Sequence, residues 1–292
     1  MSPSISAEIP HVPRVFHNYP GANYILPSDE QEIHRLKLQH DVLKAAFDGK
    51  VLLAPIKLHT SPFVLDSGTG SAAWLLDVAP DMSPSAIMHG VDIENRLFPT
   101  SHPPNISFSI NSIATLPEEW TAKFDLVHQR LLLAALRRSE WPKALSQMFR
   151  ILRPGGYVQL GEAGAWHAGA VTERHADMLH TLFESRELLL EVSSDMSTFL
   201  RDAGFVDIRV ETRTIPLGAW AGQLGADARD NFMGVYRGMK TPVLRSGGLG
   251  FVETEEDFDR LMDELEKEWD ETKGAEMKFH IFIAQKPTEC TT

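Results

Sequence analysis

The feature that most constrains the fold is a turn with two glycines, placed between an apolar segment and a helical one. Residues 62–66 read Pro-Phe-Val-Leu-Asp, the turn reads Ser67-Gly-Thr-Gly70, and a helical pattern follows over 71–78. This order of strand, glycine turn and helix opens the units of doubly wound α/β proteins. The sequence therefore predicts an α/β fold with a mostly parallel sheet and helices on both faces.

Apolar segments continue to alternate with helical patterns along the rest of the chain. Ser28 is predicted to be the N-cap of the first helix, with Gln31 at the capping-box position. A leucine-rich helix is predicted to follow the fourth strand and to reach Arg138. The other helices are expected over 28–47, 142–152, 172–203 and 254–273. Further strands are expected at 86–92, 106–110, 124–128, 157–162, 206–214 and 278–284.

The chain divides into three parts by composition and pattern. Residues 1–22 are rich in proline and serine, which predicts a flexible arm or an extended strap. Residues 23–60 are expected to form a helical cap, and 61–287 a single α/β domain. A segment at about 216–273 reads as an insertion that helps to form a substrate pocket.

Two acidic residues near the glycine turn indicate which ligand it serves. Glycine allows a ligand to approach the backbone closely, so a nicotinamide, a flavin or S-adenosylmethionine is compatible with the turn alone. Asp66 precedes the turn, where a carboxylate repels a pyrophosphate and attracts a cationic sulfonium or ammonium group. Asp92, at the end of the second strand, is placed to accept both ribose hydroxyls. The pair favours S-adenosylmethionine over a dinucleotide.

Charge, apolar runs and cysteine content limit the partners and the location that can be expected. The net charge is −12, which argues against a nucleic acid or an anionic membrane as the main partner. The sequence contains no run of about 18 apolar residues, so it predicts no membrane-spanning helix. The one cysteine, Cys290, forms no internal disulfide and fits a reducing compartment. We therefore expect a cytoplasmic protein, with the nucleus as the other location left open.

Several segments resemble those of class I S-adenosylmethionine-dependent methyltransferases. Val64–Gly70 resembles their motif I, and Ile151–Leu160 resembles the segment that leads into their fifth strand. Asn23–Glu30, Arg35–His40 and Phe124–Arg130, together with the ending Gln-Lys-Pro287, resemble fungal methyltransferases of secondary-metabolite clusters. That group includes LaeA-like regulators and gliotoxin-type N-methyltransferases, and the resemblance covers roughly residues 20–287.

The resemblance implies a fold, a cofactor and a set of binding residues. It implies a Rossmann-like fold whose seven-stranded, mostly parallel sheet has one antiparallel strand, with S-adenosylmethionine as cofactor. Ser67 stands where the family usually has Gly or Ile, and Asn111 where many members have an acid that binds the adenine amino group. An amide oxygen accepts the same hydrogen bond. The implied cofactor-binding residues are Tyr24, Asp66, Ser67, Gly68, Gly70, Asp92, Ile93, Asn111, Ser112 and Gln129.

Methyl transfer mainly requires that donor and acceptor be held together away from water, and a base is needed only where the acceptor must lose a proton. His128, at the end of the fourth strand, and His167, after the fifth, are the candidates for a base or a substrate contact. His175 and His180 do not share a helix face, so no metal site is expected. An aromatic substrate pocket is expected from Trp166, Trp220, Phe232 and Tyr236.

Three functions remain open from the sequence. The first is methyl transfer to O, N or S of a fungal small molecule that is aromatic or derived from a peptide or polyketide. The second is a regulatory protein that keeps the fold and works in a protein complex. The third is a non-methylating cyclisation or rearrangement assisted by the sulfonium charge. The chain is expected to be a monomer or a homodimer.

Overall fold

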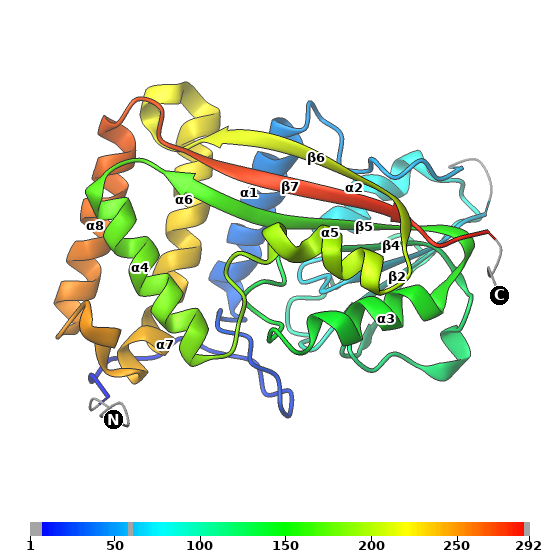
Figure 1. Cartoon of the computed structure of the whole chain (residues 1–292), viewed down its shortest axis with the longest axis horizontal. Coiled ribbons are helices and arrows are strands. Elements are labelled where there is room, and N and C mark those ends of the chain that lie inside the picture. Colours follow the sequence, from blue (N-terminus) through cyan, green and yellow to red (C-terminus); the bar gives the residue numbers. More distant parts are fainter. Residues whose placement is uncertain (1–7, 58–60, 289–292) are drawn as a thin grey trace.

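The computed structural model describes residues 8–57 and 61–288, and its centre is one twisted sheet (Figure 1). The seven strands lie in the order β3-β2-β1-β4-β5-β7-β6. β7 is antiparallel to both of its neighbours, and the other pairs are parallel. The predicted architecture is confirmed. The strands are β1 Phe63–Ser67, β2 Ile87–Asp92, β3 Ile106–Ile110, β4 Phe124–Arg130, β5 Leu152–His167, β6 Val206–Pro216 and β7 Glu276–Gln285.

Helices cover both faces of the sheet because successive strand residues point to opposite sides. Val64 and Leu126 join one buried apolar cluster, with α1 (Glu30–Ala46) and α2 (Ala73–Val78). Leu65 and Val127, one residue further along, join the other cluster, with α3 (Trp141–Ile151) and α5 (Val192–Asp202). The strands that carry the glycine turn are therefore buried on both faces and hold that turn rigidly.

A second group of helices gathers at one end of the sheet (Figure 1). It consists of α4 (Ala170–Ser185), α6 (Gly222–Gly238), α7 (Lys240–Arg245) and α8 (Glu255–Glu271). α6 packs against α1 and α8, so this group is joined to the cap over the parallel strands. In the described part of the chain, no helix is both long and apolar enough to cross a membrane.

Two predictions near the cap and the fourth strand are wrong. The N-cap of α1 is Asp29, whose side chain accepts from the Glu32 amide, whereas Ser28 is buried and its amide donates to the Val15 carbonyl. The leucine-rich helix does not form, because Leu131 has a φ of 57° and its amide donates to the Gly161 carbonyl. Residues 131–140 instead form a turn-rich segment, which we call the post-β4 segment.

The second half of the chain also departs from its predicted elements. The helix predicted over 172–203 is two helices, α4 and α5, because 186–191 leave the helical conformation and Glu187 has a φ of 58°. Most of the glycine-rich region 216–250 is helical, as α6 and α7. The helical periodicity of apolar residues is hard to recognise there, because glycines stand at closely packed positions. A Cβ at Gly225, for example, would lie 2.3 Å from the Gly218 carbonyl oxygen.

Residues 8–28, which include the described part of the predicted arm (8–22), form an extended strap. The Ile9 amide donates to the Leu244 carbonyl at 3.0 Å, and the Ile25 amide donates to the Ala134 carbonyl at 3.2 Å. Arg14 forms an ion pair with Asp29, the cap residue of α1. The strap therefore ties α7, the post-β4 segment and α1 together across one side of the molecule.

Candidate functional site

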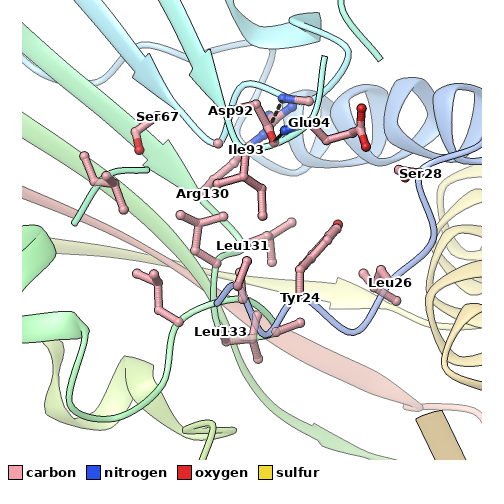
Figure 2. Close-up of a pocket in the computed structure, with 18 of the residues that line it drawn as sticks. Tyr24, Leu26, Ser28, Ser67, Asp92, Ile93, Glu94, Arg130, Leu131 and Leu133 are labelled. Carbon is pink, nitrogen blue, oxygen red and sulfur yellow. Dashed lines mark hydrogen bonds between the residues drawn. The ribbon is translucent and has the colours of Figure 1, made fainter. Parts of the chain in front are cut away.

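A cavity of about 580 Å³ lies between the carboxyl ends of the parallel strands and the helices at the end of the sheet. Its size is typical of small-molecule sites. Ser67, Asp92 and Arg130 reach it from the ends of β1, β2 and β4, and Tyr24 reaches it from the strap (Figure 2). Carboxyl ends of strands are where doubly wound sheets bind ligands.

The glycine turn after β1 brings bare backbone to the cavity. Gly68 has a φ of 65° and Gly70 a φ of 52°, a region that residues with a Cβ rarely adopt. The Thr69 amide donates to the Val91 carbonyl at 3.0 Å, which joins the turn to β2. The Thr69 hydroxyl donates to the Asp66 carboxylate at 2.6 Å. The turn is thus fixed before any ligand binds.

Asp92 joins two of the loops that form the polar wall of the cavity, those that follow β1 and β2. Its Oδ2 accepts from the Gly70 amide at 2.9 Å, and its Oδ1 accepts from the Glu94 amide at 3.1 Å (Figure 2). Burial raises the pKa of Asp92 to about 6, although these backbone hydrogen bonds favour the charged form. Each oxygen keeps a further lone pair, so the carboxylate remains able to accept from a ligand hydroxyl.

Asp66 and His128 form a buried pair behind the turn. Asp66 Oδ1 lies 2.7 Å from His128 Nδ1, and the His128 ring stacks on Trp74 at 3.8 Å between centroids. Each residue is 3% exposed and neither lines the cavity. Burial lowers the pKa of His128, against the effect of Asp66. The structure thus places the first candidate base behind the glycine turn and outside the cavity.

Two further candidates also lie away from the cavity. His167 is exposed at the end of β5. Gln129 is fully buried and accepts from the Ser67 hydroxyl at 3.4 Å. The predicted site residues that the structure does bring together in the cavity lining are Tyr24, Ser67, Gly68, Gly70, Asp92, Ile93, Asn111 and Ser112.

Two arginines line the cavity between the cap and the sheet. Arg35, on α1, is held by the Glu32 carboxylate and donates to Asn231 Oδ1 at 3.2 Å. Arg130 Nη2 lies 3.2 Å from His40 Nδ1, and no carboxylate of the described residues forms an ion pair with it. Burial lowers the pKa of Arg130 to about 10, so it still carries its charge at neutral pH. Arg130 is therefore a partly buried cation facing a ligand-sized space.

Glu162 holds the post-β4 segment in place and was not singled out by the sequence. It is fully buried on β5, and its carboxylate accepts from the Leu132 amide at 2.9 Å and the Leu133 amide at 3.4 Å. Burial raises its pKa to about 8. Leu131 to Leu136 all line the cavity. No local pattern reveals this role, because Glu162 and its partners are about 30 residues apart in the chain.

The opposite wall of the cavity is uncharged. The lining residues that come from β5, α4, α6 and β7 are Ala163, Trp166, Leu179, Phe183, Phe232, Val235, Tyr236 and Met277. Three of the four aromatic residues predicted for a substrate pocket are among them. The fourth, Trp220, lies outside the lining and donates its ring N–H to the Leu217 carbonyl. Within residues 8–57 and 61–288, no cluster of side chains has the composition of a metal site.

Known proteins resemble this chain in both sequence and fold. Residues 64–156 match the family described as a methyltransferase domain. The chain is 30% identical over 280 residues to the N-methyltransferase gliN of Aspergillus fumigatus, covering 90% of this chain and 96% of gliN. It is 32% identical over 286 residues to the N-methyltransferase sirN of Leptosphaeria maculans, covering 92% and 96% respectively.

The sheet and its helices also match solved structures. The YcgJ protein of Bacillus subtilis aligns with a TM-score of 0.51 at 15% identity, over 87% of this chain and 99% of that one. That likeness concerns the fold, whereas the two fungal relatives match almost the whole chain. The chain therefore belongs to the class I S-adenosylmethionine-dependent methyltransferases, in the fungal secondary-metabolism group that contains gliN and sirN.

Proposed function

We propose that the chain transfers the methyl group of S-adenosylmethionine to a nitrogen atom of a neutral, largely apolar small molecule of fungal secondary metabolism. The observation that carries this proposal is the division of one cavity into a polar wall around Asp92 and an uncharged wall on α4 and α6. The relatives gliN and sirN are both named N-methyltransferases, which supports nitrogen as the acceptor atom.

The polar wall fits an adenosyl group. Asp92 has lone pairs left for two ribose hydroxyls, and the backbone of Gly68 and Gly70 leaves room for the cofactor to lie against the turn. Asn111 donates through Nδ2 to the Ser109 hydroxyl at 2.7 Å. Its Oδ1 is therefore the atom oriented to accept from the adenine amino group, in place of the acid that many family members carry.

Arg130 fits the methionyl part of the cofactor. A carboxylate is the ligand group that best matches a partly buried guanidinium without an acidic partner. Tyr24 lines the same cavity, and burial raises the pKa of its phenol, so it stays protonated and able to donate. We assign Arg130 and Tyr24 to the methionyl carboxylate, and Asp66 and His128 to the support of the turn behind it.

The cofactor supplies an activated methyl group, and the chain supplies orientation and exclusion of water. The strap and the post-β4 segment line the cavity together with α1 and α6, so an acceptor held there is surrounded by protein. An amine nitrogen carries a free lone pair, and the proton of the ammonium that results would be lost to water once the product has left the cavity. The reaction therefore needs no base at the position of His128.

Product mass tests this proposal directly. The protein is incubated with S-adenosylmethionine carrying a trideuterated methyl group and with panels of amides, amines, phenols and thiols of similar size. We expect products in which one CD₃ group replaces hydrogen on nitrogen. Products labelled on oxygen or sulfur would refute the acceptor atom, and isomerised products without label would indicate a rearrangement. Cofactor binding with no labelled product across all four panels would contradict the proposal and favour a regulatory role.

A further inference from the structure

Arg130 is held in the cavity lining by a histidine rather than by an acid. Its Nη2 lies 3.2 Å from His40 Nδ1, and among the described residues its guanidinium has no other hydrogen-bond partner. Arg35, the other arginine of the lining, is instead paired with the Glu32 carboxylate. A carboxylate neutralises the guanidinium that it fixes, whereas a neutral imidazole fixes it without removing its charge. Arg130 therefore keeps a charge that a ligand can use.

The contact with Arg130 decides which ring nitrogen of His40 carries the proton. A guanidinium only donates hydrogen bonds, so His40 Nδ1 must be the acceptor. Burial lowers the pKa of His40 to about 4, and the charge of Arg130 acts in the same direction, so the ring is neutral at pH 7. The single ring proton of His40 is therefore on Nε2.

Asp77, on α2, lies on the other side of the His40 ring. Its Oδ2 is 3.1 Å from His40 Nε2 but out of line with the ring N–H, so it acts on the ring mainly through its charge. Its Oδ1 accepts from Lys44 Nζ at 2.6 Å, which fixes the carboxylate. A carboxylate beside Nε2 favours the tautomer with the proton on that atom, the same one that Arg130 requires. Contacts from α2 through α1 to β4 thus end at the cavity.

We infer that His40 is a positioning residue for the methyl donor, which holds the Arg130 guanidinium in place for the methionyl carboxylate and leaves its charge intact. Asp77 keeps the imidazole in the tautomer that this contact requires. An arginine that is fixed beforehand loses less side-chain freedom when the ligand binds, so the affinity is higher. This inference rests on the proposed function, in which Arg130 binds that carboxylate.

Two ligands separate the positioning of Arg130 from a general effect on the site. S-adenosylhomocysteine carries the carboxylate, and methylthioadenosine lacks it. By calorimetry, we expect His40→Leu to weaken S-adenosylhomocysteine about 3- to 10-fold, the range for fixing one flexible side chain, and to leave methylthioadenosine within about twofold. His40→Asn should restore most of the affinity, because its amide oxygen replaces Nδ1 as an acceptor. His34→Leu, the same change at an exposed position of α1, is the control and should bind both ligands like the wild type.

A double-mutant cycle shows whether His40 acts through Arg130. In the Arg130→Met background, His40→Leu should change the affinity for S-adenosylhomocysteine by less than about twofold, because the side chain that it positions is gone. The full loss in both backgrounds would overturn the inference. So would an equal loss of methylthioadenosine binding, or unchanged or tighter binding of S-adenosylhomocysteine by His40→Leu.

The tautomer of His40 provides a test on the unmodified protein. Long-range ¹H–¹⁵N NMR distinguishes protonated from unprotonated ring nitrogens, and comparison with His40→Asn identifies the signals of this ring. We expect the proton on Nε2 at pH 7. A proton on Nδ1, or on both nitrogens, would overturn the inference, because Nδ1 could then not accept from Arg130.

The same titrations keep this inference apart from the proposed function. Normal binding of both ligands by the wild type, with His40→Leu affecting them equally, would refute the positioning role alone. Failure of the wild type to bind either ligand would refute the proposed function and this inference with it. Unchanged near-ultraviolet circular dichroism confirms that a variant has kept its packing.

Discussion

The two walls of the cavity are built in opposite ways. The polar wall consists of loops that directly follow β1, β2 and β4, and its key carboxylate, Asp92, has a backbone partner for each oxygen. The uncharged wall consists of packed side chains from β5, α4, α6 and β7, and none of them carries a charge. The first wall is fixed by backbone hydrogen bonds, and the second is shaped by the packing of side chains.

This difference matches the two reactants of a methyltransferase. The methyl donor is the same molecule throughout the family, so its site can be fixed by strand ends and backbone. The acceptor differs between enzymes, and its site is formed by side chains that change without altering the sheet. The comparison therefore predicts that changes on the polar wall affect cofactor binding, while changes on the uncharged wall affect acceptor choice.

Among changes to the backbone of the turn, the largest effect is expected from Gly68→Val. Its φ of 65° is costly for a β-branched residue, and the new Cβ would lie 2.8 Å from Leu132 Cδ2. We expect cofactor affinity to fall about 100-fold by calorimetry, because the turn relaxes to relieve the strain and binding must restore its conformation at a cost of about 3 kcal/mol. Gly49→Val is the matched control, with a φ of 81° and no atom near the new Cβ. Equal loss of affinity in the control would show that the effect is general instability.

A smaller effect is expected from Arg130→Met. Loss of a charge-assisted bond to the methionyl carboxylate should weaken S-adenosylhomocysteine about 10- to 100-fold. Methylthioadenosine, which has no carboxylate, should bind the variant and the wild type alike. Arg153→Met is the control, because Arg153 pairs with Asp125 and does not line the cavity. A parallel loss of methylthioadenosine binding would contradict the assignment of Arg130.

Much of the polar wall was predictable from the sequence, and most of the uncharged wall was not. The strand, turn and helix around Gly68 and the acid at Asp92 are local signals, so their positions follow from the order of residues. The roles of Asp66 and His128 were not predictable, because their contact is made between two neighbouring strands. The sequence suggested Trp166, Phe232 and Tyr236 for the pocket. It did not show that the fold brings β5 and α6 to the same wall, because these elements are distant in the chain.

The next effect concerns pH and stability at Glu162. Its folded pKa of about 8 lies above the ordinary value of 4.5, so the folded state binds the extra proton between these values. Stability from this group is therefore present at low pH and lost as pH rises toward about 8, by at most about 1.4 kcal/mol per pH unit. Urea unfolding of Glu162→Gln should show a weaker decline over this range than the wild type. Glu211→Gln, which changes an exposed carboxylate, serves as the control. An identical decline of stability with pH in the wild type and both variants would show that Glu162 is not its source.

Cofactor binding should also weaken in acid. Burial raises the pKa of Asp92 to about 6, and the protonated carboxyl loses acceptor capacity toward the ribose. Affinity for S-adenosylhomocysteine should be constant above about pH 7 and fall by up to about tenfold between pH 6 and pH 5. A pH-independent affinity measured by calorimetry over this range would argue against contact between Asp92 and the ligand.

The smallest effect is expected at His167, which is exposed and outside the cavity. His167→Ala should leave both cofactor affinity and turnover within about twofold of the wild type, because surface substitutions rarely change free energies by more than about 0.5 kcal/mol. Turnover is followed by transfer of the labelled methyl group. A large loss would place His167 at the acceptor and would break the division between the two walls.

The most direct test of the account is calorimetric titration of S-adenosylmethionine and S-adenosylhomocysteine into the wild type and Asp92→Ala. The control is Asp41→Ala, which removes an exposed carboxylate paired with Lys37 on α1. We predict binding of both compounds to the wild type and the control, and a loss of about 100-fold or more in Asp92→Ala, the value for two charge-assisted hydrogen bonds. Equal affinity in all three proteins, or no binding to the wild type, would contradict the assignment of the polar wall to the methyl donor.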